Sequence, residues 1–310
     1  MTNLNPASEG IEFRQARPED AEGIAELYKK AYGWVFPLTE YSDSGRVKQI
    51  IEENKRIWHI AVNKKEIIGS SVGIPHKWNN SVEIGRTIID KKFYNSKIAR
   101  TLCERVKEEA SKQDVDICWG HLRNKAIYNV AKHLDMKVVG YLPGLHKSEV
   151  RELHLLCMYL SATAKEKRQA PKNCTIYRSD VIKEIMKELR LSTAVGDYPS
   201  DIFAEPISDC VVPIKISHYH REKSTIIHSI DNFNKLAADY IQVTVLADKI
   251  DAMRFFSRFG FEFCAFLPAW FEKEGKRYDC VTMSNYGIKP TALEEQFFET
   301  VARFKKIKLG

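Results

Sequence analysis

The stretch Met136-Lys-Val-Val-Gly-Tyr-Leu-Pro143 has a second copy in Phe261-Glu-Phe-Cys-Ala-Phe-Leu-Pro268. The two prolines are 125 positions apart, and this spacing is kept without a gap as far as Met158 and Met283. An amphipathic stretch precedes each copy, residues 124–135 and 249–260. Because solenoid repeats have periods of roughly 20–50 residues, two copies at this longer spacing indicate a duplicated domain.

The composition is that of a folded protein with room for two domains. The chain has 310 residues, of which 44% are hydrophobic, and this suffices for two separate cores. No apolar run is long enough to cross a bilayer, so we expect no membrane partner. Seven cysteines without a Cys-x-x-Cys pair are typical of reduced core thiols, and the N-terminus lacks the features of a signal peptide. We therefore expect cytoplasmic localisation.

The net charge of +7 is compatible with anionic small ligands. No nucleic-acid motif or aromatic-basic stripe accompanies it, so we expect no nucleic-acid partner. His218-Tyr-His220 places two imidazoles on one face of a strand, and His228 lies on a neighbouring segment. A zinc site needs a third and usually a fourth ligand, which this pattern does not supply, so no metal site is predicted.

The first half has the pattern of an α+β fold, in which a mixed β-sheet is flanked by helices. Pro18 opens a helix whose apolar residues recur at helical spacing, namely Ile24, Leu27, Tyr28 and Ala31. The expected strands cover residues 11–16, 57–62, 66–74, 82–89 and 116–119. Further helices are expected over residues 96–110 and 124–135.

A polar, basic segment with a proline, residues 161–173, has the composition of a domain linker. It separates a first domain, residues 1–160, from a second, residues 174–310. In the second domain we expect helices over 181–191 and 232–239 and strands over 209–217, 224–230 and 241–246. A last helix begins near Pro290 and carries an apolar face of Leu293, Phe297, Val301 and Phe304. We expect that face to pack against the body of the protein.

Phe13-Arg-Gln-Ala-Arg-Pro-Glu-Asp20 resembles the opening of the GNAT superfamily of acyl-CoA-dependent N-acetyltransferases. Leu134-Asp-Met-Lys-Val-Val-Gly140 and Phe259-Gly-Phe-Glu-Phe-Cys264 lie where the family carries Leu-Gly-Phe followed by Val-Gly. The resemblance covers residues 11–160 and, less completely, 174–286. It implies two GNAT-like domains, each with a central mixed sheet.

The resemblance also implies a site for the pyrophosphate of CoA. The family holds this group on a loop of pattern Gln/Arg-x-x-Gly-x-Gly/Ala that opens a helix, where free N–H groups and the helix dipole favour an anion. The matching positions are Tyr94, Asn95, Ser96, Lys97, Ile98 and Ala99, followed by Arg100. Tyr94 replaces the Gln or Arg, and Lys97 replaces the first Gly. Lys97 and Arg100 either contact phosphate or form an ordinary solvated face. The second half contains no comparable loop.

An acceptor amine must lose a proton when it attacks a thioester. In the family a carboxylate on the strand before the CoA loop often takes this proton, and Glu83 has that position. Glu83 is alternatively an exposed strand carboxylate or pairs with Arg86 or a neighbouring strand. Backbone N–H groups of Thr87, Ile88 and Ile89 are expected to polarise the thioester carbonyl.

The tyrosine that usually serves the family as general acid is replaced by Ala131, and by Phe256 in the second copy. Tyr128 lies one helical turn earlier and either substitutes for it or is a core or surface tyrosine. Asn124 matches an asparagine that often contacts CoA in the family, and it equally suits a helix N-cap.

The sequence therefore predicts one acyl-CoA-binding domain and a degenerate GNAT-like partner. The predicted function is transfer of an acyl group from an acyl-CoA, foremost acetyl-CoA, directly to a small-molecule amine. Two alternatives stay open: a non-catalytic descendant that binds CoA or another ligand as a sensor or scaffold, and an acyltransferase that acts on a carrier-protein thiol. The identity of the acceptor and the formation of a homodimer are left open.

Overall fold

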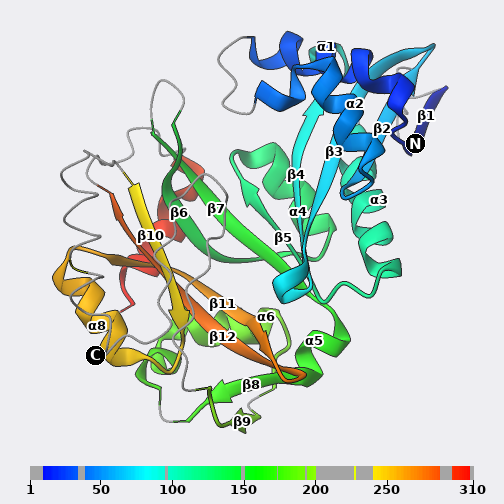
Figure 1. Cartoon of the computed structure of the whole chain (residues 1–310). Coiled ribbons are helices and arrows are strands. Elements are labelled where there is room, and N and C mark those ends of the chain that lie inside the picture. Colours follow the sequence, from blue (N-terminus) through cyan, green and yellow to red (C-terminus); the bar gives the residue numbers. More distant parts are fainter. Residues whose placement is uncertain are drawn as a thin grey trace, which may run out of the picture. The chain divides into compact units, whose positions relative to one another are not determined.

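The computed structural model describes residues 10–33, 39–94, 97–147, 151–172, 174–192, 194–199, 227, 240–286 and 295–307 (Figure 1). The chain divides into two compact units. The first unit comprises Met1–Gly120 and Ala126–Met136, and the second comprises His121–Lys125 and Lys137–Gly310.

The strands of the first unit lie in the order β1-β2-β3-β4-β5. Neighbours are antiparallel except β4 and β5, which are parallel, so the predicted mixed sheet is confirmed. The last two residues of β5 belong to the second unit. The bounds are β1 Ile11–Gln15, β2 Ile57–Asn63, β3 Glu66–His76, β4 Ser81–Ile89 and β5 Ile117–Leu122.

Helices cover both faces of this sheet. One hydrophobic cluster joins α1 and α2 to Trp58, Ile60 and Ile88 on one face. A second cluster joins α3 to Ala61 and Ile68, which project from the other face. The helical segments are η2 Pro18–Asp20, α1 Ala21–Tyr32, η3 Thr39–Tyr41, α2 Ser44–Glu52, η4 Lys77–Asn79, η5 Lys91–Phe93, α3 Ile98–Lys112 and α4 Lys125–His133.

The predicted start of the first helix is confirmed, with one addition. Pro18 begins a short 3-10 turn that leads directly into α1. Asp20 is buried there and accepts two hydrogen bonds from Arg14 of β1, at 2.7 and 2.8 Å. Burial opposes the charge of Asp20, but hydrogen bonds from the Arg14 guanidinium and the Arg17 N–H, together with the charges of both arginines, lower the pKa of that carboxyl. The ion pair therefore ties the helix start to the first strand.

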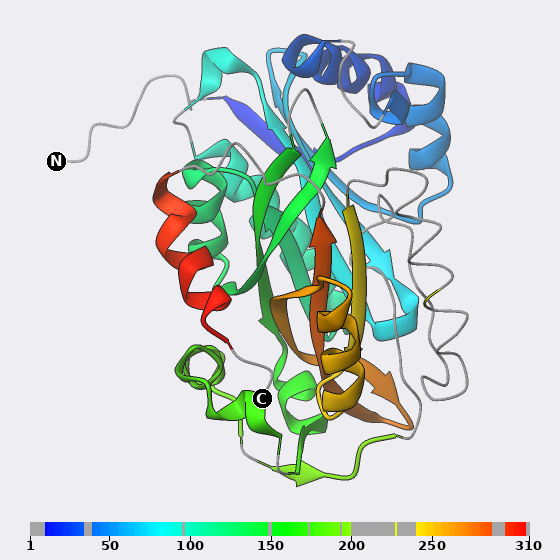
Figure 2. The same ribbon diagram turned by 90° about the vertical axis from the view of Figure 1, so that its left-hand side faces the viewer.

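The second unit contains the hairpins β6–β7 and β11–β12. The strand β10 pairs with β12 on the side away from β11, and α9 packs on β6 and β11 (Figure 2). The strands are β6 Lys137–Lys147, β7 Arg151–Leu160, β8 Arg168–Pro171, β9 Val195–Gly196, β10 Tyr240–Leu246, β11 Glu262–Lys273 and β12 Lys276–Tyr286. The helices are α5 Ala162–Lys167, η6 Thr175–Arg178, α6 Asp180–Glu188, α8 Ile250–Arg258 and α9 Glu295–Lys305.

The sequence repeat corresponds to a repeated local structure. The hairpin β6–β7 has an irregular register between Val138 and Gly140, and β11–β12 has one between Phe263 and Ala265. These positions are equivalent at the spacing of 125. Gly140 and Ala265 also pair with each other, because β6 lies antiparallel to β11. Equivalent residues that face one another across antiparallel strands relate the two hairpins by a local two-fold axis.

Gly140 is required by this contact. A Cβ atom at Gly140 would lie 2.3 Å from Cβ of Ala265 and 2.5 Å from the Cys264 carbonyl oxygen. Both distances are shorter than van der Waals contact, and one of the atoms is backbone. Only glycine therefore lets the two copies approach this closely.

The segment predicted as a linker, residues 161–173, contains α5 and β8. Arg168 is buried and donates to both carboxylate oxygens of Asp279 on β12, from Nε at 2.7 Å and from Nη2 at 2.5 Å. Although burial disfavours its charge, Asp279 raises the pKa of Arg168. The compact units divide near residue 136. The division into domains at 160 and 174 stays a prediction.

Most of the other expected elements lie within one to three residues of their predicted bounds. The helix expected over 181–191 ends earlier, at Glu188. In α9, Phe297, Val301 and Phe304 are buried, as predicted, whereas Leu293 lies outside the described residues. The elements expected over 209–217, 224–230 and 232–239 and the histidines of the 218–228 region also lie outside them, apart from the single residue Ile227. Across the described helices, none combines the length and apolarity needed to cross a membrane.

Candidate active site

The strands β4 and β5 form a fork in the first unit. Their parallel pairing is confined to Ser81–Glu83 on β4 and Ile117–Trp119 on β5. Gly120 lies at the point of closest approach, where a Cβ would be 2.7 Å from the carbonyl oxygen of Ile84. Beyond it, among the described residues, β4 pairs only with β3. One edge of β4 therefore has backbone groups available to a ligand.

A β-bulge interrupts β4 just beyond the fork. Ser70 pairs with Ile88 and Val72 with Gly85, so two residues of β4 lie opposite one of β3. Arg86, the first of the two, has φ of +51°, a left-handed conformation that is strained for any residue with a Cβ. A bulge removes backbone groups from the ladder. Arg86 and Thr87 are the two residues of β4 at the bulge, whereas Ile88 pairs with Ser70 and Ile89 with Gly69 on β3.

Side chains from both helical layers hold the bulge. Tyr28 of α1 donates from its hydroxyl to the Arg86 carbonyl oxygen at 2.5 Å. Burial raises the pKa of Tyr28, so this hydroxyl stays protonated. On the other face, the Thr87 hydroxyl lies 2.9 Å from the Ser71 hydroxyl and 3.4 Å from the Cys103 sulfur of α3. Burial raises the pKa of the Cys103 thiol. These contacts make the bulge a rigid, preorganised segment.

Glu83 is buried and its carboxylate is paired with Arg86. Oε1 accepts a hydrogen bond from Nη1 of Arg86. Oε2 lies 4.0 Å from Nε2 of His76. Burial disfavours the charged guanidinium, but the Glu83 carboxylate raises the pKa of Arg86 above its ordinary value. The pairing alternative that the sequence left open for Glu83 is therefore the one observed.

The remaining hydrophobic members of the predicted CoA segment are core residues. Ile88 packs in the α1–α2 cluster, and Ile98 packs in the α3 cluster with Ile89 at its edge. The side chains of these three residues pack in the hydrophobic clusters. The residues can therefore offer only their backbone groups to a ligand.

The chain between β4 and α3 begins with a fixed turn. Asp90 accepts a hydrogen bond from the Lys92 N–H at 3.0 Å and forms an ion pair with Lys30 at 2.5 Å. The hydrogen bond from Lys30 lowers the pKa of Asp90. Tyr94 follows and is 57% exposed. Asn95 and Ser96 lie outside the described residues.

Lys97 is exposed and is the N-cap residue of α3, which begins at Ile98. The Lys97 side chain makes no cap hydrogen bond, and no acidic residue lies in the first turn of the helix. Ala99 is half-buried, and Arg100 donates from Nε to Glu104 at 2.7 Å. The first N–H groups of a helix have no intrahelical acceptor. This helix start therefore has positive character and no carboxylate of its own turn to neutralise it.

The candidate general acid, Tyr128, lies on α4, whereas the other candidates of the first unit lie on β4 and at the start of α3. Tyr128 is a half-buried residue of α4, and Nζ of Lys132 lies 4.7 Å from its ring centroid. Ala131, which replaces the family's tyrosine, is buried. Asn124 is exposed and directly precedes α4, but belongs to the second unit. The structure thus brings Glu83 and Thr87–Ile89 together on β4, while the roles of Tyr128 and Asn124 stay predictions.

The features of the first unit fit an acyl-CoA. The open edge of β4 offers hydrogen bonds to an amide-containing chain, and the start of α3 with Lys97 offers positive charge to phosphates. Gly120 leaves the fork unobstructed by a side chain. In the described residues, no group of three or more histidine, cysteine, aspartate or glutamate side chains is arranged to hold a metal.

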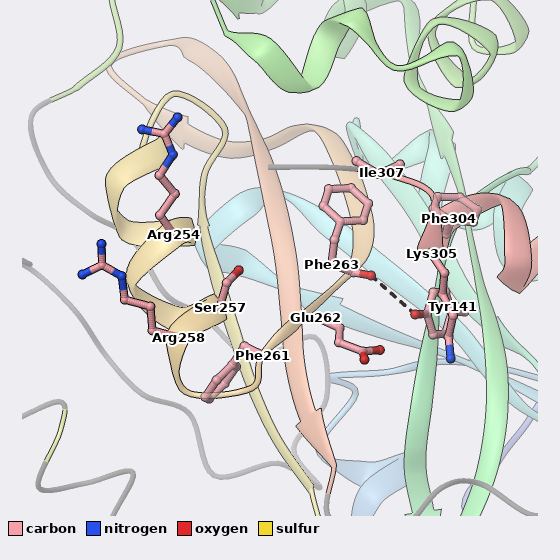
Figure 3. A pocket seen from close by; sticks show the side chains of 10 residues that line it. All are labelled: Tyr141, Arg254, Ser257, Arg258, Phe261, Glu262, Phe263, Phe304, Lys305 and Ile307. Atoms are coloured by element: carbon pink, nitrogen blue, oxygen red, sulfur yellow. Dashed lines mark hydrogen bonds between the residues drawn. The ribbon is translucent and has the colours of Figure 1, made fainter. Parts of the chain in front are cut away.

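A pocket of about 740 Å³ lies in the second unit (Figure 3). Residues of α8, β11, β6 and the α9 region line it, and the Tyr141 hydroxyl lies 3.5 Å from the Phe263 carbonyl oxygen. The guanidinium groups of Arg254 and Arg258 point away from the aromatic rings on the opposite wall. None of the predicted site residues lines this pocket, so it is not the predicted CoA site.

Sequence reasoning missed the residues that support the bulge. Tyr28 was predicted as a core residue, and its hydroxyl function was not considered. Ser71 and Cys103 carry no motif, and only the pairing of β3 with β4 and α3 places them beside Thr87. The one available signal was the polar Ser70-Ser71 pair within an otherwise apolar strand.

The fold and the fork together define a class of fold. In this class a mixed sheet contains two parallel strands that splay apart, and a helix begins soon after the first of them. Solved structures of GNAT acetyltransferases are similar to about half of this chain. A ribosomal-protein-alanine N-acetyltransferase from Brucella melitensis has a TM-score of 0.44 and 16% identity, and the match covers 48% of this chain and 99% of that one. A GNAT-family acetyltransferase from Streptococcus pneumoniae has a TM-score of 0.43 and 15% identity, over 48% and 98%.

A third similar structure is the PaiA N-acetyltransferase from Thermoplasma acidophilum in complex with coenzyme A, with a TM-score of 0.39 and 16% identity. That match covers 49% of this chain and 99% of the other. No family model and no curated protein matches the chain.

Proposed function

We propose that the first unit transfers an acyl group from an acyl-CoA, foremost acetyl-CoA, to the amine of a small molecule. The observation that carries the proposal is the bulge at Arg86–Thr87 beside the open fork of β4 and β5. A strand edge without a partner beyond the fork, a β-bulge and a positive helix start follow one another along a short length of chain. This sequence of features suits a thioester with an amide-containing arm and a pyrophosphate.

The chemistry follows from these groups. The acyl-CoA supplies an activated carbonyl, and the amides of the bulge donate hydrogen bonds to its oxygen. The amine attacks, so a C–N bond forms and the C–S bond breaks, and the sulfur leaves with the bonding electron pair. The nitrogen releases one proton to Glu83, directly or through water, and that proton then neutralises the thiolate. Glu83 is near the bulge but shares its carboxylate with Arg86, so proton transfer takes place from within an ion pair.

A second candidate function is a non-catalytic CoA sensor. It is favoured by Lys97 at the position of a family glycine and by buried Ala131 in place of a tyrosine. Both functions require CoA to bind at the first unit, and they differ in turnover. Transfer to a carrier-protein thiol remains a third alternative, which a thiol acceptor in the same assay tests.

Thermal unfolding with acetyl-CoA, CoA and longer acyl-CoAs tests the common requirement. A ligand at about one hundred times its Kd stabilises a folded protein by roughly 2.7 kcal/mol, which raises Tm by a few degrees. Release of the CoA thiol across a panel of amines then separates the enzyme from the sensor. If no acyl-CoA raises Tm, the proposal is wrong at its base.

Glu83→Gln tests the proton acceptor. We expect it to lower kcat by about 10²- to 10⁴-fold while the CoA Kd changes little, because the amide keeps the size of the carboxyl but cannot take a proton. Glu104→Gln, at the partner of Arg100 on α3, is the matched control and should leave kcat unchanged. An equal loss of kcat and CoA affinity in Glu83→Gln would point to misfolding of the bulge instead.

A further inference from the structure

A polar cluster lies on the face of the first unit that α1 and α2 cover. Ser81 and Glu83 project to the same face of β4, and their partners are His76 on β3 and Trp119 on β5. The His76 ring lies 5.4 Å from the Trp119 ring, whose Nε1 donates to the Ser81 hydroxyl at 3.2 Å. These contacts line up an imidazole, an indole and the Glu83–Arg86 pair next to the bulge.

The cluster presents its donors outward and its acceptor inward. The Glu83 side chain is 6% exposed, whereas Arg86 is 16% and His76 20% exposed. Glu83 accepts from Nη1 of Arg86, and Nε of Arg86 is buried without a hydrogen-bond partner in the described part of the chain. The Arg86 side chain is therefore more accessible on this face than the Glu83 carboxylate, and it still has donor capacity.

The charge count of the cluster limits what can bind there. Glu83 neutralises the charge of Arg86. Tyr41, also buried on this face, has its pKa raised by burial, so it stays a neutral phenol. A dianionic phosphate would meet too little positive charge here. A single carboxylate matches the planar edge of a guanidinium that already has one carboxylate partner.

We propose that Arg86 binds the carboxylate of the acceptor, and that the acceptor is an amine with a nearby carboxylate, in the class of amino acids. This inference rests on the proposed function, because it places the acceptor on the side of the bulge away from the α3 start. Arg86 itself forms the bulge, so the bound carboxylate lies only a few atoms from the amine that attacks. Arg86 is thereby the residue that determines acceptor specificity.

Matched acceptor pairs test the proposal. Each common amino acid is compared with its own amide, which keeps the amine and the side chain but replaces the carboxylate with a neutral group. For the accepted amino acid, we expect kcat/KM to exceed that of its amide by roughly 10- to 100-fold, the value of a hydrogen bond to a charged group. Thiol release from acetyl-CoA is the readout.

Variants of Arg86 identify the group responsible. Arg86→Gln should remove the preference for the acid, and Arg86→Lys should retain part of it, since an ammonium keeps the charge but not the planar fork. Both keep a Cβ at a position with φ of +51°, so they share the strain of the native residue. Arg46→Gln is the control and should keep the full preference, because Arg46 is an exposed arginine of α2 whose guanidinium donates to Gln49.

The outcomes separate this proposal from the proposed function. A loss of kcat/KM that is equal for acids and amides in Arg86→Gln overturns it, because Arg86 then only holds Glu83. The proposal is also overturned if the wild-type protein acylates the amides as efficiently as the acids. If no amine is acylated, the proposed function fails. Binding of a carboxylate by Arg86 is then tested separately, by Tm shifts in the presence of CoA. N-acetyl amino acids should then raise Tm more than their amides, and this difference should disappear in Arg86→Gln.

Discussion

Arg86 combines three properties, of which the sequence indicated only the pairing with Glu83, as one alternative. It has a left-handed backbone, it pairs with Glu83, and its carbonyl oxygen accepts a hydrogen bond from Tyr28. The sequence identified Glu83 from its position on the strand and included Arg86 among its alternatives. It could not show the bulge, because an extra residue in one strand is defined by the register of its partner.

Lys97→Glu tests the phosphate role of the α3 start. Charge reversal places a carboxylate where the helix dipole and the ammonium favour an anion, so we expect CoA to bind roughly tenfold or more weakly. Isothermal titration calorimetry with CoA measures the effect. Lys112→Glu, at the other end of α3, is the control and should leave the Kd unchanged. Unchanged affinity in Lys97→Glu would mean that the phosphates bind elsewhere.

At the scale of elements, the strand and helix order of the first unit was predictable. The apolar residues of each element recur at helical or strand spacing, and turn residues separate the elements. The hairpin of β2 and β3 turns at Lys64-Lys65, and α1 has its predicted buried face of Ile24, Leu27 and Tyr28. In residues 161–173 the composition did not reveal two regular elements, α5 and β8. Arg168 contributed to the basic, linker-like composition, yet its guanidinium is fully buried against Asp279. A buried ion pair between distant residues leaves no local signal.

Gly140→Ala tests the contact between the repeated hairpins. The added Cβ would overlap with Cβ of Ala265 and with the Cys264 carbonyl oxygen, and overpacking of this kind costs about 1–3 kcal/mol. Chemical denaturation should show that loss in the free energy of unfolding. Ala265→Gly in the same chain should not restore it, because the backbone oxygen remains in place. Gly45→Ala in α2 is the control, since its Cβ would meet only Asp43 Oδ1, at 3.3 Å.

The ion pair of Asp90 predicts a pH dependence of stability. Its folded pKa is depressed, so its contribution is present above the unfolded value of 3.8 and is lost as pH falls through the lower folded value. We expect the difference in Tm between wild type and Asp90→Asn to be constant near neutral pH and to shrink below about pH 4. Asp114→Asn is a control. A difference that stays the same down to pH 2 would show that Asp90 acts only as a turn residue.

For the whole molecule, the repeat predicted two related halves, and the structure shows repeated hairpins with equivalent irregularities. The sequence could not show that the hairpins pair with each other, since that contact depends on the close approach that Gly140 permits. Nor could it locate the compact units, because α4 and β6 are consecutive in the repeat and yet belong to different units.

The repeat does not double the proposed site. The fork, the bulge and the positive helix start belong to the first unit, and we expect one acyl-CoA to bind per chain. The stoichiometry from calorimetry with CoA should be close to one, and Lys97→Glu should weaken that single binding event. Two equivalent binding events would contradict the assignment of one site.

The pairing of Gly140 with Ala265 has a consequence for assembly. Equivalent residues that face one another across a two-fold axis are the mark of an isologous interface, the kind that joins two identical subunits. When both partners belong to one polypeptide, the connecting chain sets their effective concentration, on the order of millimolar for short flexible connections. Formation of this sheet is therefore independent of dilution, and a contact typical of a dimer becomes a permanent part of a single chain.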